Sequence, residues 1–186
     1  MILPIVAFGS PILRKKCINI TDEYPGLDSL LDNMWKTMYQ ASGVGLAAPQ
    51  INKSIRLFLI NTAPFLDDEE VTEEKIVEQV FINARIIEEK GEKWDFNEGC
   101  LSIPDVREDV SRKSTITIEY FDENFKKHTD TYDGLTARVI QHEYDHVDGI
   151  LFTDKISALR KRMIKGKLMD ISKGKVNAAY KMRFAR

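Results

Sequence analysis

The chain has 186 residues, of which 43% are hydrophobic, and its net charge at pH 7 is −2. This length and composition predict one globular domain with a sizeable apolar core. Its apolar runs are far shorter than the roughly 20 residues that cross a bilayer, and Pro4 and Pro11 interrupt the apolar N-terminal segment. We therefore expect a soluble protein of the cytosol with no membrane segment, and we expect the N-terminal segment to be part of the mature protein rather than a signal peptide.

The near-neutral charge conceals two very different parts. Residues 1–154 carry 16 basic and 28 acidic side chains, whereas residues 155–186 carry 11 basic and one acidic. We interpret residues 1–154 as the main domain and residues 155–186 as a basic C-terminal helix or tail. Such a basic tail indicates contact with nucleic acid or another anionic surface. The alternative is a solvated helix that only balances the acidic domain.

In chain order, the first predicted element is an amphipathic helix within residues 26–43, where apolar residues recur three and four positions apart and Gly43 acts as a stop. Residues 55–61, IRLFLIN, are rich in β-branched and aromatic side chains and predict a buried strand. The acidic run at residues 67–74 predicts a solvated loop. One or two further strands are expected in residues 76–89.

The next segment alternates apolar and polar residues on both sides of a turn. Residues 115–121 and 125–132 therefore predict an antiparallel hairpin around Asp122-Glu123-Asn124. Helical periodicity then runs from Leu135 to Gly149, and a last segment from about Thr153 is helical at first and less clearly so past Gly166. This order predicts an α+β domain, with mostly antiparallel sheets packed around the helix of residues 135–149.

That helix carries the H-E-x-x-H pattern at residues 142–146. His142 and His146 are four residues apart, so their imidazoles stand one turn above each other and converge on one point. Glu143 is rotated by about 100° from His142 and flanks that point. The pattern predicts a divalent metal site with a carboxylate placed to handle the protons of a water molecule. The alternative, two ordinary helix histidines, is disfavoured by the complete pattern.

A catalytic metal usually takes three protein ligands and leaves one position open. A downstream glutamate is impossible, because Glu143 is the last glutamate in the chain. The metzincin extension fails, because its final histidine falls on Phe152. We favour Cys100, which lies in the bend-forming stretch NEGCLSIPD, because a thiolate binds borderline-soft metals tightly. From the residues alone the question stays open between Cys100 and the other candidates, which are Cys17, His128, Asp148 and Asp154.

A second unusual stretch is GVGLAAPQ at residues 43–50. Its glycines and alanines leave the backbone open to close approach by a ligand. Gln50 could then offer its amide NH₂ to a developing oxyanion. The alternative is a helix stop that is followed by a loop of small residues.

Taken together, three segments resemble the motifs of the peptide deformylase family. They are GVGLAAPQ, EGCLS at residues 98–102 and QHEYDH at residues 141–146, and their order and spacing also agree. The resemblance implies that Cys100, His142 and His146 are the metal ligands and that Glu143 is the acid and base. It also implies that Gln50 and the backbone N–H of Leu101 form the oxyanion hole.

The resemblance further implies the substrate, which is the N-terminal formyl-methionine of newly made bacterial proteins, and the product formate. The peptide would pair as a strand with the backbone of Val44, Gly45 and Leu46. An apolar pocket would hold the methionine side chain, and its candidate residues are Val44, Leu101, Leu135 and Val139. Arg107 stands where the family often has a basic residue, and it is expected either to hold the peptide backbone or to form a simple salt bridge.

The cofactor and partners follow from the same resemblance. One cysteine and two histidines suit Zn²⁺, Fe²⁺, Ni²⁺ or Co²⁺, and the resemblance favours Fe²⁺ in the cell. The expected partners are nascent N-formylmethionyl peptides and, through the basic tail, the ribosome. We expect no sequence-specific nucleic-acid binding and a location in the bacterial cytoplasm.

Overall fold

The computed structural model describes residues 1–65 and 76–185, and the acidic loop predicted at residues 67–74 lies outside them. The helices are α1 (Leu27–Gln40), α2 (Gly134–Val147) and α3 (Ala158–Ser172), with short 3₁₀ helices at Pro11–Arg14, Ala48–Ile51, Ala63–Phe65 and Phe152–Asp154. The strands are β1 (Ile5–Val6), β2 (Gly45–Ala47), β3 (Leu57–Asn61), β4 (Glu78–Cys100), β5 (Ile103–Phe121), β6 (Lys127–Asp133) and β7 (Met182–Arg183). None of the described helices combines the length and the hydropathy of a bilayer-spanning segment.

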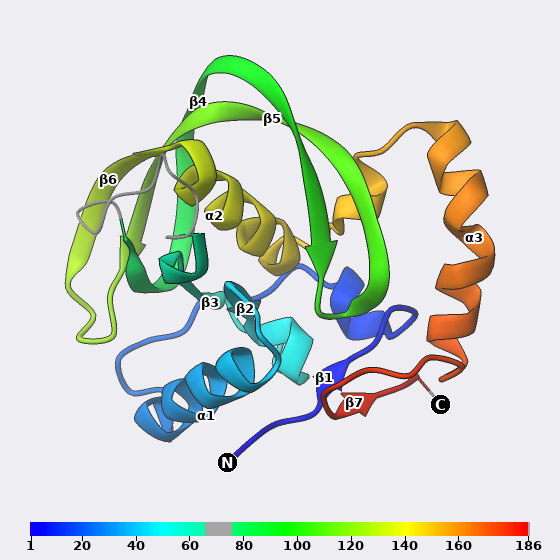
Figure 1. The fold of residues 1–186 in the computed structure, drawn as a ribbon. Helices are drawn as coiled ribbons and strands as arrows, with labels where there is room; N and C mark the ends of the chain where they lie inside the picture. Colours follow the sequence, from blue (N-terminus) through cyan, green and yellow to red (C-terminus); the bar gives the residue numbers. More distant parts are fainter. Residues whose placement is uncertain (66–75, 186) are drawn as a thin grey trace.

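Five strands form one sheet in the order β2-β3-β4-β5-β6, and every neighbouring pair in it is antiparallel. A separate two-stranded parallel sheet joins β1 to β7 near the two chain ends (Figure 1). The prediction of an α+β fold with mostly antiparallel strands is confirmed. The predicted hairpin is also confirmed as β5 and β6, and the predicted helix of residues 135–149 is α2.

The long strands β4 and β5 form a curved hairpin that arches over α2 (Figure 1). Register shifts interrupt this pairing at several points, including the one between Lys90 and Lys93. Such irregularities bend a strand and increase its twist. At the tip, Leu101 and Ser102 form the turn, so Cys100 is the last residue of β4. The curvature of the hairpin therefore brings its tip back toward α2.

Helix α2 packs one apolar face against the concave side of the sheet. Ala137, Ile140 and Val147 are fully buried in one cluster with the stacked rings of Phe58 and Phe81. Burying a valine, isoleucine or phenylalanine side chain stabilises the fold by about 1.5–3 kcal/mol. Helix α2 therefore has a fixed orientation, and the histidine side of the helix faces the hairpin tip.

Helix α1 covers the other side of β2 and β3. Leu31, Met34 and Met38 are buried with Leu46 and Leu57 in a second cluster, as the three- and four-residue spacing predicts. The sequence did not predict β2 itself, because three small or apolar residues carry no strand signal apart from their pairing with β3. As the end strand of the sheet, β2 pairs with β3 on one side only.

The C-terminal helix starts later and ends later than the sequence predicts. Ser157 caps α3 by accepting a hydrogen bond from the Arg160 N–H at 3.3 Å, because a serine oxygen satisfies an otherwise unpaired N–H at a helix start. The helix continues through Gly166 to Ser172. Ile164 and Ile171 are buried against the main domain, in a third cluster with Val110 and Phe152 among others. The division of the chain after residue 154 stays a prediction.

Candidate active site

The tip of the β4–β5 hairpin meets the histidine side of α2. The Cys100 Sγ lies 3.3 Å from the His146 Nε2, and ligand atoms of Cys100, His142 and His146 all lie within 4.8 Å of one another. Ligands at tetrahedral zinc distances would be about 3.3–3.6 Å apart. One thiol and two imidazoles are thus gathered at the spacing of a metal site, although Cys100 precedes His142 by more than 40 residues.

A buried carboxylate orients the first of these imidazoles. The Glu98 Oε2 lies 3.0 Å from the His142 Nδ1, which leaves Nε2 facing the cysteine. Burial alone would raise the pKa of Glu98, but hydrogen bonds from Arg112 and His142 hold it well below its usual range. An ionised carboxylate behind a histidine fixes the imidazole ring and makes it a better ligand.

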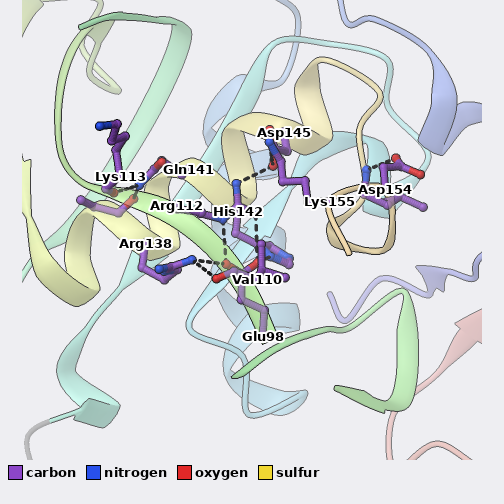
Figure 2. A network of polar contacts seen from close by, with 12 residues as sticks. Glu98, Val110, Arg112, Lys113, Arg138, Gln141, His142, Asp145, Asp154 and Lys155 are labelled. Atoms are coloured by element: carbon purple, nitrogen blue, oxygen red, sulfur yellow. Dashed lines mark hydrogen bonds and ion pairs between the residues drawn. The ribbon is translucent and has the colours of Figure 1, made fainter. Parts of the chain in front are cut away.

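Two guanidinium groups hold Glu98 in turn (Figure 2). Arg112 donates to both Glu98 oxygens at 2.7 and 2.9 Å and to the Asp145 Oδ2 at 2.6 Å. Arg138 donates to Glu98 at 3.0 Å and to the Trp94 carbonyl at 2.7 Å, and it stacks over the Trp94 ring. No pattern in the sequence indicated this network, because its members lie far apart along the chain and meet only in the folded structure.

Glu143 is buried beside the same histidines. Its side chain lines the cavity, and its Oε2 has no hydrogen-bond partner among the described residues. Burial raises the pKa of Glu143 to about 7. Gly45 makes the room for it, because a Cβ at this position would lie 2.5 Å from the Glu143 Oε1. A buried carboxylate with an unpaired oxygen, set beside three metal-type donors, fits a site that also holds water.

Gln50 also reaches the cysteine. Its Oε1 accepts a hydrogen bond from the Ala47 N–H at 2.8 Å, which sets the orientation of the amide. Its Nε2 then lies 3.5 Å from the Cys100 Sγ and 3.3 Å from the Ser102 Oγ. The 3₁₀ helix after β2 therefore points an N–H donor at the cluster.

These groups border a cavity of about 600 Å³. Most of the residues predicted for substrate contact line it, namely Val44, Gly45, Leu101, Arg107 and Val139. Leu46 and Leu135 are not among the described residues that line it. Leu46, the central residue of β2, is instead fully buried in the second apolar cluster, against α1.

Arg107 is exposed and lines this cavity, and it pairs with Gly99 across the hairpin. Its Nε donates to the Asn97 Oδ1 at 2.9 Å and its Nη2 to the Asn97 carbonyl at 2.5 Å. It forms no salt bridge with an acidic side chain among the described residues. The guanidinium is thus held by hydrogen bonds at the cavity entrance.

Several lining residues were not predicted from the sequence. They include Phe65, Phe96 and Tyr180. Phe96 could have been suspected, because it lies two residues before Glu98 on the same face of its strand. No sequence signal indicates Tyr180, since it lies in the C-terminal segment that we interpreted as a tail.

The family model for polypeptide deformylase matches residues 2–162. Among known proteins, the peptide deformylase of Christiangramia forsetii is 63% identical over 99% of this chain and 96% of its own length. The peptide deformylase of Flavobacterium johnsoniae is 57% identical over 100% of this chain and 97% of its own. These relatives are bacterial proteins.

Solved structures of peptide deformylases are also similar to this chain. The peptide deformylase of Legionella pneumophila is 35% identical, with a TM-score of 0.80 over 94% of this chain and 98% of that one. The peptide deformylase of Plasmodium falciparum is 36% identical, with a TM-score of 0.81 over 91% of this chain and 95% of that one. The chain belongs to the polypeptide deformylase family.

Proposed function

We propose that this chain removes the formyl group from the N-terminal formyl-methionine of newly made polypeptides and releases formate. Peptide deformylases catalyse this metal-dependent reaction, and the chain belongs to their family. The observation that carries the proposal is the 3.3 Å approach of the Cys100 Sγ to the His146 Nε2, beside a buried carboxylate with an unpaired oxygen. This arrangement supplies a ligand set and a proton carrier in one cavity.

Cys100, His142 and His146 would hold one divalent ion. The cysteine and histidine donors suit Zn²⁺, Fe²⁺, Ni²⁺ or Co²⁺, and we propose Fe²⁺ in the cell. When bound, such an ion polarises a carbonyl group and lowers the pKa of water. Arg112 and Arg138 contribute indirectly, since they keep Glu98 ionised behind His142.

Glu143 would act as base and then as acid. It takes a proton from water, whose oxygen attacks the formyl carbon, and it delivers that proton to the departing amine nitrogen. The carbon–nitrogen bond breaks, and the products are formate and a free N-terminus. A pKa near 7 suits a group that must both accept and donate a proton at neutral pH.

Hydrogen-bond donors are needed to stabilise the negative charge that develops on the formyl oxygen. The Gln50 Nε2, which points toward Cys100, and the backbone N–H of Leu101 would supply them. Donors placed in advance stabilise the transition state more than the ground state.

The peptide would extend along the open edge of β2. The Asn61 N–H donates to the Val44 carbonyl at 2.9 Å, and antiparallel alternation then directs the N–H and carbonyl of Gly45 away from β3. A substrate strand can pair with these groups. Leu46, the next residue of β2, belongs to the proposed segment by position, and by the same alternation its own N–H and carbonyl face β3.

The methionine side chain would enter the cavity between Val44, Leu101 and Val139, which all line it. Leu135 stays a predicted member of this pocket. Arg107 would contact the peptide at the rim, where its guanidinium is already held by Asn97.

We also propose a cytoplasmic location and nascent chains as the partners. Helix α3 exposes a run of basic side chains that includes Lys161, Arg162, Lys165 and Lys167. Such a surface suits ribosomal RNA, because phosphate contacts need positive charge rather than a specific sequence. Residues 1–154 would then carry the catalysis and residues 155–186 the ribosome contact.

Protein purified without air should contain about one divalent ion per chain and release formate from formyl-Met-Ala. Removal of the ion by a chelator should abolish this release, because the ion supplies the polarisation of the formyl carbonyl and the lowered pKa of the water. Metal analysis and a formate assay on the same preparation check both points. Cleavage of unformylated peptides at internal amides would instead identify a metallopeptidase and contradict the proposal.

Gln50→Ala should lower kcat by about 10²–10³-fold, because it removes one oxyanion donor. The folded structure should persist, as judged by thermal unfolding. Gln79→Ala is the matched control, since the Gln79 amide donates to the Val80 carbonyl outside the cavity. Equal activity of the two variants would exclude Gln50 from the oxyanion hole.

Gly45→Ala should lower kcat by about 100-fold, because the new Cβ displaces the Glu143 carboxylate, and small displacements of catalytic groups have effects of this size. Overpacking should also cost about 1–3 kcal/mol of unfolding free energy. Gly166→Ala is the control, since a Cβ there meets nothing within 4 Å. Steady-state kinetics and denaturant unfolding separate the two effects, and wild-type kcat in Gly45→Ala would argue against the role of Glu143.

Charge reversal on α3 tests the ribosome contact. The double variant Arg162→Glu and Lys165→Glu should weaken cosedimentation with ribosomes about tenfold, and formate release from formyl-Met-Ala should be unchanged. Lys53→Glu with Lys126→Glu changes the net charge equally at exposed positions outside α3. Equal weakening by both pairs would show a general charge effect and contradict a specific role for α3.

A further inference from the structure

The chain does not end as a free tail after α3. It turns at Gly174 and runs back past the hairpin tip to β7, which pairs with β1 (Figure 1). We call residues 175–184 the C-terminal strap. The Ile5 N–H donates to the Lys181 carbonyl and the Ala7 N–H to the Arg183 carbonyl, each at 2.8 Å. These bonds attach the strap to the first strand of the protein.

Apolar side chains fix the strap from its other side. Val176, Met182 and Phe184 pack against the third apolar cluster, which also contains Ile103 and Val106 of β5. The strap is thus anchored by backbone hydrogen bonds and by side-chain packing. Residues 177–180, which lie between these anchors, form one wall of the catalytic cavity.

Tyr180 reaches from this wall to the hairpin turn. Its hydroxyl donates to the Leu101 carbonyl at 2.7 Å, and the ring is half-buried. The next residue, Ser102, accepts two hydrogen bonds. Its carbonyl accepts one from the Phe8 N–H at 2.8 Å, and its hydroxyl accepts one from the Gln50 Nε2 at 3.3 Å. The turn is therefore held by three separate segments, and Tyr180 holds the residue whose N–H is the proposed oxyanion donor.

We propose that Tyr180 is a positioning residue for deformylation: by holding the Leu101 carbonyl it fixes the backbone of Leu101 at the hairpin turn, and with it the Leu101 N–H in the preceding peptide plane. The proposal rests on the function proposed above. Tyr180 lies beyond residue 162, where the match to the family model ends, so none of the three motifs assigns it this role.

The physical reason is that the reaction tolerates only a small displacement of its hydrogen-bond donors. Catalytic donors must lie within about 0.5 Å of their productive position, and a two-residue turn has few internal contacts that fix its peptide planes. A donor that is misplaced loses strength mainly in the transition state, where the oxygen carries charge. Loss of the Tyr180 hydrogen bond should therefore lower kcat and leave KM nearly unchanged.

The test is Tyr180→Phe, which removes the hydroxyl and keeps the ring in the cavity wall. We expect kcat for formyl-Met-Ala to fall about 3- to 10-fold, the change expected for one neutral hydrogen bond, with KM within about twofold of wild type. Amide hydrogen exchange at Leu101 and Ser102 should become faster, while exchange in β3 stays the same.

Tyr132→Phe is the matched control. Tyr132 also loses a hydroxyl contact, to the Tyr120 hydroxyl at 3.2 Å, and it lies outside the cavity lining. This variant should keep wild-type kcat. Wild-type kcat in Tyr180→Phe, or an equal loss in both variants, would overturn the inference. Failure of the wild-type protein to release formate would instead overturn the proposed function, so the two failures are distinguishable.

Discussion

The site depends on one buried carboxylate. Glu98 is 4% exposed and contacts Arg112, Arg138 and His142, so it joins β4, β5 and α2 at a single point. Removing one partner from a buried charge network costs about 3–5 kcal/mol, because the remaining charge is left without compensation. The geometry of the proposed metal ligands is therefore tied to the packing of the sheet against the helix.

Small residues are the second requirement of this arrangement. Gly45 leaves space for the Glu143 carboxylate, and Gly43 does the same for Leu101, whose Cδ1 would lie 2.8 Å from a Cβ at position 43. The close approach of β2 to α2 and to the hairpin turn explains why the GVGLAAPQ stretch contains so few large side chains. Backbone, rather than large side chains, therefore forms much of the cavity wall at Gly43, Val44 and Gly45.

Local patterns in the sequence predicted the elements whose signal lies within a few residues. Helix α2 with His142 and His146 and the β5–β6 hairpin belong to this group. Residues 90–100 of β4 were not predicted, because Lys90, Glu92 and Lys93 are exposed and charged and carry no alternating apolar signal. That part of the strand exists because it pairs with β5.

The residues of the candidate site also divide into those that a local pattern predicted and those that it did not. Periodicity placed two histidines and a glutamate on one helix, but it could not select Cys100 over four other candidates, and only the resemblance did so. The partners of Glu98 lie 14 to 44 residues away in sequence. Contacts of this kind are decided by tertiary packing, which no local pattern encodes.

Because β7 lies at the end of the chain and pairs with β1, the wall of the cavity that precedes β7 is synthesised last. Leu101 and its hydroxyl partner are 79 residues apart, and translation proceeds from the N-terminus. The hairpin, its ligands and the histidine helix can all form while the last wall of the cavity is still unmade. Completion of the cavity is thus one of the last steps in the folding of a protein that itself acts on other newly made polypeptides.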